Sequence, residues 1–181
     1  MPLSQKHIYT SEDYWNLPEG QRAELIDGQI YDMAPPGFKH QKIISQVSYC
    51  LNDYIKQNGG NCEVVPAPFA VNLDGDDKNW VEPDISVICD KRKLTERGCS
   101  GAPDFIVEVV SPSSRRMDYS KKNTLYSDFG VREYWIIDPA KECTTVYYYE
   151  EDAAPAIYAF SQSISVSIFK GLSINIAELL K

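Results

Sequence analysis

The chain has 181 residues, 43% hydrophobic and 24% charged, which suits one globular domain over 1–181 with its own core. No apolar run approaches a membrane span and the amino terminus lacks a secretory apolar segment, so we expect no membrane partner and a cytoplasmic location. The net charge of −8 argues against broad, non-specific binding to nucleic acid, because that binding depends on a basic surface.

The first half of the chain begins with helix and hairpin patterns. Ser11 is a candidate cap for the first helix, and Asp27-Gly28 is a typical hairpin turn. The predicted elements are a short helix over 11–17, a hairpin over 23–34, a long helix over 38–58, and a strand over 62–73 that Pro66 and Pro68 interrupt.

The second half alternates strands with one further helix, which we expect Ser113 or Ser114 to cap. The predicted elements are strands over 80–89 and 103–110, a helix over 115–129, strands over 130–139, 143–149, 156–161 and 164–169, and a terminal helical turn over 176–180. This order indicates an α/β or α+β fold with a mixed sheet flanked by helices.

The five cysteines are scattered, odd in number and never spaced as Cys-x-x-Cys. We therefore expect neither a disulfide framework nor a zinc site. Cys89 and Cys143 are interpreted as small apolar residues.

Two acids, Asp84 and Glu108, lie inside apolar segments that we predict to be buried strands. A buried acid is costly unless it is paired or binds a cation. Asp104 lies on the same strand as Glu108 but about 13 Å along it, too far to share an ion. If Asp84 lies on the strand next to Glu108, the spacing of about 4.8 Å between strands suits one divalent metal between the two carboxylates.

The helix after Glu108 contributes further polar groups. Asp118, Lys122 and Tyr126 are four residues apart and so share one helix face. Lys122 would then reach a metal-bound water or a phosphate, although an ordinary surface ion pair between Asp118 and Lys122 is an open alternative. Arg115 and Arg116 are candidates for phosphate contacts near the start of this helix.

Four motifs together resemble the Uma-type family of putative restriction endonucleases, in the PD-(D/E)XK nuclease-like superfamily. They are Val-Glu-Pro-Asp84-Ile, Pro-Asp-Phe-Ile-Val-Glu108-Val-Val-Ser-Pro-Ser, Asp118-x-x-x-Lys122-x-x-x-Tyr126 and Gly130-Val-x-Glu-Tyr-Trp-Ile-Ile-Asp-Pro139. Glu24-Leu-Ile-Asp-Gly, His40 and Phe169-Lys-Gly-Leu also match, so the resemblance covers nearly the whole chain.

The resemblance implies a restriction-endonuclease-like core with Mg²⁺, or Mn²⁺, bound at Asp84 and Glu108. The wider superfamily has a lysine two residues after the second acid, where this chain has Val110. The family pattern places a lysine on the following helix instead, and Lys122 matches it. The family resemblance alone identifies Glu24 as a candidate third acid of the metal site.

The leading hypothesis is therefore a metal-dependent endonuclease that cleaves nucleic acid, with DNA as the expected substrate. The oligomeric state stays open, with a homodimer as a candidate, because the two strands of a duplex are related by two-fold symmetry. Two alternatives remain open: a catalytically inactive nuclease-fold module that binds nucleic acid or regulates, and a structural protein that dimerises through its carboxyl-terminal strands. His40 is interpreted as a surface residue at a helix start, and Glu133 as a partner for an arginine. Tyr126, Tyr134 and Trp135 are assigned to the core.

Overall fold

The computed structural model describes residues 7–151 and 153–181. Its central sheet has six strands in the order β12-β11-β10-β9-β6-β3. Only β9 and β10 run parallel among these pairs, so the sheet is mixed, as predicted. The strands are β3 (Glu63–Pro66), β6 (Ile85–Ile88), β9 (Phe105–Val109), β10 (Glu133–Asp138), β11 (Cys143–Tyr148) and β12 (Ala156–Ala159).

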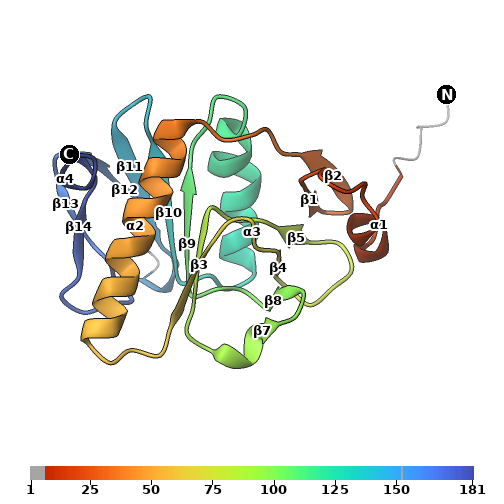
Figure 1. Ribbon diagram of the computed structural model, residues 1–181, viewed down its shortest axis with the longest axis horizontal. Coiled ribbons are helices and arrows are strands. Elements are labelled where there is room, and N and C mark those ends of the chain that lie inside the picture. Colours follow the sequence, from red (N-terminus) through yellow and green to blue (C-terminus); the bar gives the residue numbers. More distant parts are fainter. Residues whose placement is uncertain (1–6, 152) are drawn as a thin grey trace.

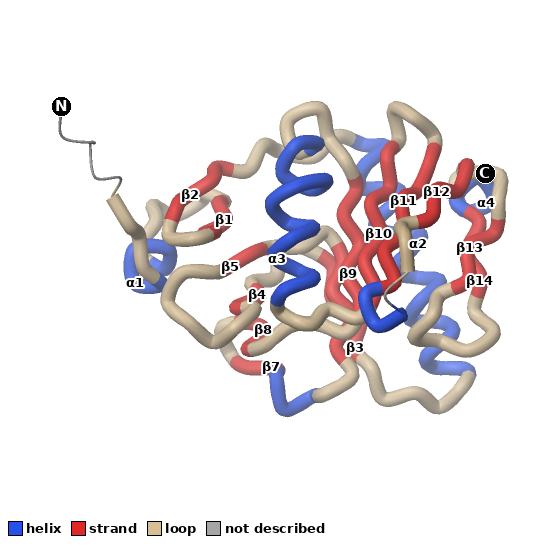
Figure 2. Tube along the Cα trace, turned by 180° about the vertical axis from the view of Figure 1, so that it is seen from behind, coloured by secondary structure: helices blue, strands red, loops and turns tan. Residues whose placement is uncertain are grey.

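Helices cover both faces of this sheet (Figures 1 and 2). The long helix α2 (Phe38–Gln57) packs Ile43, Val47 and Leu51 into the core on one face. On the other face lies the helix over 115–128, which comprises a π-helical part, η2 (Met117–Lys122), and α3 (Asn123–Asp128). This arrangement confirms the predicted α+β architecture of a mixed sheet flanked by helices.

A second six-stranded sheet, in the order β2-β1-β5-β4-β8-β7, packs on the same side as α3. It contains the predicted hairpin, whose turn residue Asp27 has a positive φ of 51°. The strands are β1 (Ala23–Ile26), β2 (Gln29–Asp32), β4 (Val71–Asn72), β5 (Trp80–Val81), β7 (Leu94–Thr95) and β8 (Gly98–Ser100).

The segment 80–89, predicted as one strand, is two strands in two different sheets. β5 belongs to the second sheet and β6 to the central sheet. Pro83 lies between them and has no N–H to continue a ladder, so the chain leaves one sheet here and enters the other. Asp84 therefore lies immediately before β6, where the two sheets meet.

The ends of the chain carry smaller elements. Helix α1 (Ser11–Trp15) is capped by Thr10, not by Ser11 as predicted, because Thr10 and Asp13 form a reciprocal capping box. None of the helices within residues 7–151 and 153–181 has both the length and the apolar character needed to cross a bilayer. The remaining elements are η1 (Lys91–Lys93), η3 (Tyr149–Glu151), β13 (Ser163–Ser165), β14 (Ser173–Asn175) and α4 (Ile176–Leu179).

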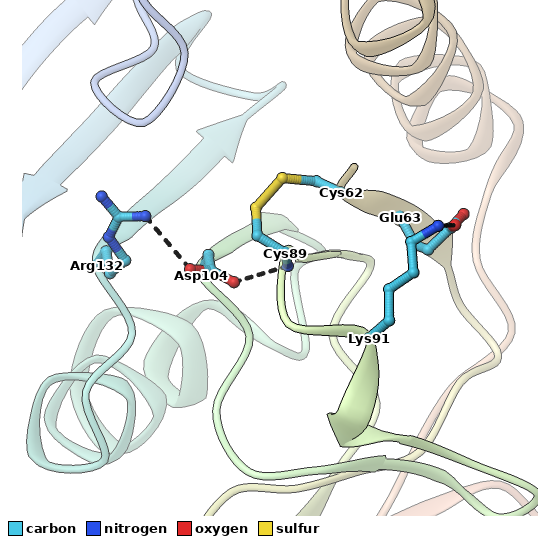
Figure 3. Close-up of a disulfide and its surroundings, with 6 residues drawn as sticks. All are labelled: Cys62, Glu63, Cys89, Lys91, Asp104 and Arg132. Atoms are coloured by element: carbon cyan, nitrogen blue, oxygen red, sulfur yellow. Dashed lines mark hydrogen bonds and ion pairs between the residues drawn. A yellow bond between two sulfur atoms is a disulfide. The ribbon is translucent and has the colours of Figure 1, made fainter. Parts of the chain in front are cut away.

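Cys62 and Cys89 form a disulfide, so the prediction that the cysteines are unbridged is wrong for this pair (Figure 3). The two residues extend the β3–β6 pairing by one position beyond Glu63 and Ile88. Cross-strand neighbours of this kind come close without any spacing signal in the sequence, because 26 residues separate them along the chain. The bond ties the edge strand β3 to its neighbour.

Candidate active site

Asp84 and Glu108 lie on neighbouring chain segments, and each carboxylate accepts a backbone N–H of the other segment. The Val109 N–H donates to Asp84 Oδ2 at 2.7 Å, and the Asp84 N–H donates to Glu108 Oε2 at 3.4 Å. The antiparallel register that pairs Ile85 with Val107 brings the two acids opposite one another. The structure thus brings together the two acids that the sequence singled out.

The helix over 115–128 supplies a lysine and a tyrosine to the same place. Lys122 Nζ and the Tyr126 hydroxyl each donate to Glu108 Oε1 at 2.8 Å. Both side chains are buried. Lys122 lies in the π-helical part of the helix, a conformation that often marks functional sites.

Glu24 reaches the site from strand β1 of the second sheet. Its Oε1 lies 2.9 Å from Lys122 Nζ and accepts the Glu82 N–H at 2.9 Å. Lys122 therefore lies between two carboxylates, one from each sheet. This position explains why the motif around Glu24 belongs with the motifs around Asp84 and Glu108.

Asp118 is the fourth acid of the site, and with Glu24, Asp84 and Glu108 it forms an acidic cluster. The sequence left open the alternative that Asp118 and Lys122 form an ordinary ion pair on the surface. The Asp118 side chain is 2% exposed, and its Oδ1 lies 3.9 Å from Lys122 Nζ. Oδ1 has no hydrogen-bond partner among the described residues. The surface-pair interpretation is wrong, because both members are buried beneath the second sheet.

His40 is a member of the site that the sequence interpretation assigned to the surface. Its Nε2 lies 3.2 Å from Asp84 Oδ2, and its side chain is only 15% exposed. Burial alone would lower the pKa of His40, but the hydrogen bond and the charge of Asp84 raise it above its ordinary value. The only sequence signal was its place in the motif, at the head of a long helix.

The cluster contains more negative charge than positive charge. Four buried carboxylates, from Glu24, Asp84, Glu108 and Asp118, face Lys122 and His40. Burial raises the pKa of Glu108 well above its usual range and that of Asp118 to about 6, although Lys122 opposes both shifts. Such an excess of buried acid is the setting in which a cation is stabilised.

Lys122 itself keeps its proton. Burial would lower its pKa, but the charges of Glu108, Glu24 and Asp118 together raise it well above the ordinary value. The ammonium group is therefore fixed as a positive charge next to Glu108. Position 110, two residues after Glu108, holds the buried Val110.

Other candidates lie outside the site. Glu133 does not pair with an arginine: it accepts from Trp135 Nε1 at 2.7 Å and from Ser167 N at 2.8 Å, on the α2 side of the sheet. Asp104 pairs with Arg132 and accepts the Cys89 N–H (Figure 3). Tyr134 and Trp135 are fully buried in the core, as predicted.

The acids of the cluster offer carboxylate oxygens, the type of ligand that Mg²⁺ takes in proteins. Within residues 7–151 and 153–181, no group of three or more His, Cys, Asp or Glu side chains is arranged so that it could hold a metal ion. Mg²⁺, however, is commonly held by only one or two carboxylates and keeps several waters. Asp84 and Glu108, with excess negative charge around them, fit that requirement.

Three comparisons relate the chain to known proteins. The model of the Uma2 family, described as putative restriction endonuclease, matches residues 11–177. An uncharacterized protein of Synechocystis sp. is 27% identical over 143 residues, which are 78% of this chain and 74% of that protein. A crystal structure from Anabaena variabilis, described as a putative nuclease belonging to DUF820, has a TM-score of 0.76 at 24% identity and covers 94% of this chain and 96% of its own. The match of the family model over residues 11–177, a range that includes the whole acidic cluster, shows that this protein belongs to the Uma2 family of putative restriction endonucleases.

Proposed function

We propose that this protein is a Mg²⁺-dependent endonuclease that hydrolyses phosphodiester bonds of DNA in the cytoplasm, with Mn²⁺ as a functional substitute. The observation that supports this most is the pair of buried carboxylates from adjacent segments, Asp84 and Glu108, with the ammonium group of Lys122 2.8 Å from one of them. Carboxylates for a metal and a fixed positive charge for the phosphate are the parts that such hydrolysis needs.

Each residue then has a distinct task. Asp84 and Glu108 would hold the metal, which supplies an acidified water and stabilises charge on the phosphate. Lys122 orients the water or neutralises the charge that develops on the phosphate oxygens. Glu24 and Tyr126 fix Lys122 and Glu108, respectively, and Glu24 is also a candidate supplementary ligand. His40 orients the Asp84 carboxylate through Oδ2.

The direct test is a titration of Mg²⁺ and Mn²⁺ against panels of duplex and single-stranded DNA. We expect native protein to cut in the presence of either metal and Glu108→Ala to lose essentially all cleavage. Glu19→Ala is the matched control, since Glu19 is exposed and should cut normally. Equal cleavage by native protein and Glu108→Ala would contradict the proposal.

Metal binding should also appear as a shift in thermal stability. Mg²⁺ or Mn²⁺ stabilises the folded state by mass action, because only that state holds the two acids together. We expect the melting temperature to rise with metal in the native protein, and most of that rise to disappear in Asp84→Asn and in Glu108→Gln. An unchanged metal response in both variants would show that the ions bind elsewhere.

A binding module without cleavage is the second candidate, favoured by Val110 at the usual lysine position. It predicts DNA binding with no turnover under any metal in the panel.

A homodimer would let two sites act on the two strands of a duplex, and light scattering with and without DNA measures that assembly.

A further inference from the structure

A basic pocket lies at the start of the helix over 115–128, outside the acidic cluster. It has a volume of about 550 Å³. Three cationic side chains, from Arg115, Arg116 and Lys141, line it together with Tyr119 and Ser113. In a chain of net charge −8, three cations around one cavity are a local reversal of sign that suits an anion.

The cations of this basic pocket differ in how they are held. Arg115 is anchored, because both terminal nitrogens of its guanidinium bond the buried carboxylate of Asp138. Arg116 and Lys141 are exposed, and neither forms an ion pair within residues 7–151 and 153–181. Their charges are therefore available to a ligand, while Asp138 neutralises that of Arg115.

Tyr119 gives the basic pocket an apolar wall. Its ring is half-buried, and Lys141 Nζ lies 6.0 Å from the ring centroid. A flat aromatic wall beside two free cations suits a ligand that carries both a phosphate and a sugar or base.

The register of the central sheet places the basic pocket close to the acidic cluster. Glu108 pairs with Ile136 across the parallel strands β9 and β10, and Asp138 lies two residues further along β10 on the same face. Two residues along a strand and one strand across correspond to about 8 Å between the Glu108 and Asp138 backbones. Asp118 and Tyr119, adjacent in sequence, reach the cluster and the pocket, respectively.

The members of the cluster with the most exposed side chains, His40 and Asp84, lie on the same side. Lys39 Nζ donates to the Pro139 carbonyl at 3.2 Å, so the start of α2 lies against the turn that carries Lys141. His40, the next residue of α2, contacts Asp84, whose side chain is 12% exposed. A ligand that reaches Asp84 past His40 would therefore extend toward the basic pocket.

We propose that the basic pocket binds an internal phosphodiester group of the nucleic-acid strand whose neighbouring linkage is held at Asp84 and Glu108. Arg116 and Lys141 contact the phosphate oxygens, and Tyr119 packs against the adjoining sugar or base. This inference rests on the proposed function for its ligand, nucleic acid. It assigns a substrate-positioning role to residues that touch neither the metal ligands nor Lys122.

The test measures binding without cleavage. Fluorescence anisotropy in EDTA measures the affinity for DNA over a series of salt concentrations, for native protein and for the pocket variant Arg116→Ala/Lys141→Ala. The ligands are a 12-base-pair DNA duplex with 5′-hydroxyl ends and the same duplex with 5′-phosphates. Arg92→Ala/Lys170→Ala is the matched control, since it removes the same charge from exposed residues elsewhere. We expect the pocket variant to bind both duplexes roughly 10- to 100-fold more weakly, with a salt slope smaller by about two, while the control binds nearly as the native protein does.

The outcomes separate this inference from the proposed function. Weaker binding by the pocket variant supports the inference even if no metal yields cleavage. Cleavage by native protein, with equal affinity and salt slope in the pocket and control variants, would overturn the inference and leave the nuclease proposal intact. A loss confined to the 5′-phosphorylated duplex would assign the pocket to a strand terminus and overturn the internal assignment.

Discussion

Lys122→Met should reduce cleavage by roughly 10²–10³-fold, the loss typical of removing one preorganised electrostatic donor, and should also destabilise the protein. Lys122 is buried against Glu108 and Glu24, at 2.8 and 2.9 Å, with Asp118 nearby. Removing the positive partner of a buried ion pair leaves uncompensated charge and costs about 3–5 kcal/mol of unfolding free energy. Urea unfolding and single-turnover cleavage measure the two effects separately.

The destabilisation of Lys122→Met should depend on pH. Without the ammonium group, burial and mutual repulsion raise the folded-state pKa values of Glu108 and Asp118 further above their unfolded values. An acid whose pKa is raised on folding makes the protein less stable as pH rises through that window. The difference from native protein should therefore be larger at pH 8 than at pH 5.

Lys121→Met is the control on the same helix. Lys121 is exposed and contacts the Tyr31 hydroxyl and ring, outside the acidic cluster. Its loss should cost no more than about 1 kcal/mol and leave cleavage nearly unchanged. Loss of cleavage in Lys121→Met with normal cleavage in Lys122→Met would overturn the role assigned to Lys122.

The pattern of buried segments was enough to predict the centre of the fold. Glu108 lies within the otherwise apolar segment that forms β9, and the segment over 133–138 forms its parallel neighbour β10. The prediction that Asp84 lies on the segment next to Glu108 is confirmed. It followed from the requirement that two acids which share an ion come from neighbouring segments. What the pattern missed was the change of sheet at Pro83, because residues 80–89 were taken as one apolar segment, whereas the hydrogen-bond ladder stops at the proline.

The electrostatic environment of the site was less predictable than its position. The four-residue spacing placed Asp118, Lys122 and Tyr126 on one helix face, but it could not tell a solvent-facing side from one that the second sheet covers. Likewise, nothing local distinguishes His40 from an ordinary helix-start residue. The burial of Lys122 and the place of His40 in the site both depend on contacts between segments far apart in the chain. These contacts join Glu24 to Lys122 and His40 to Asp84.

Asp118→Asn should make the metal-free protein more stable at neutral pH. Burial raises the pKa of Asp118 from 3.8 to about 6, more than Lys122 lowers it, so ionising this carboxyl disfavours the folded state. The native protein should therefore lose stability as pH rises from about 4 to about 6, whereas asparagine has no proton to lose. The pKa difference corresponds to at most about 3 kcal/mol above pH 6.

Urea unfolding of both proteins in EDTA between pH 4 and pH 8 measures this effect. The two free energies of unfolding should coincide near pH 4, diverge up to about pH 6 and then stay parallel. Asp128→Asn, at an exposed position of the same helix, should follow the native curve throughout. The contrary result would be an Asp118→Asn variant that is less stable than native protein at pH 7. The attraction between Asp118 and Lys122 at 3.9 Å would then outweigh the cost of burying the carboxylate. In that case the acidic cluster would hold no excess charge for a cation to neutralise.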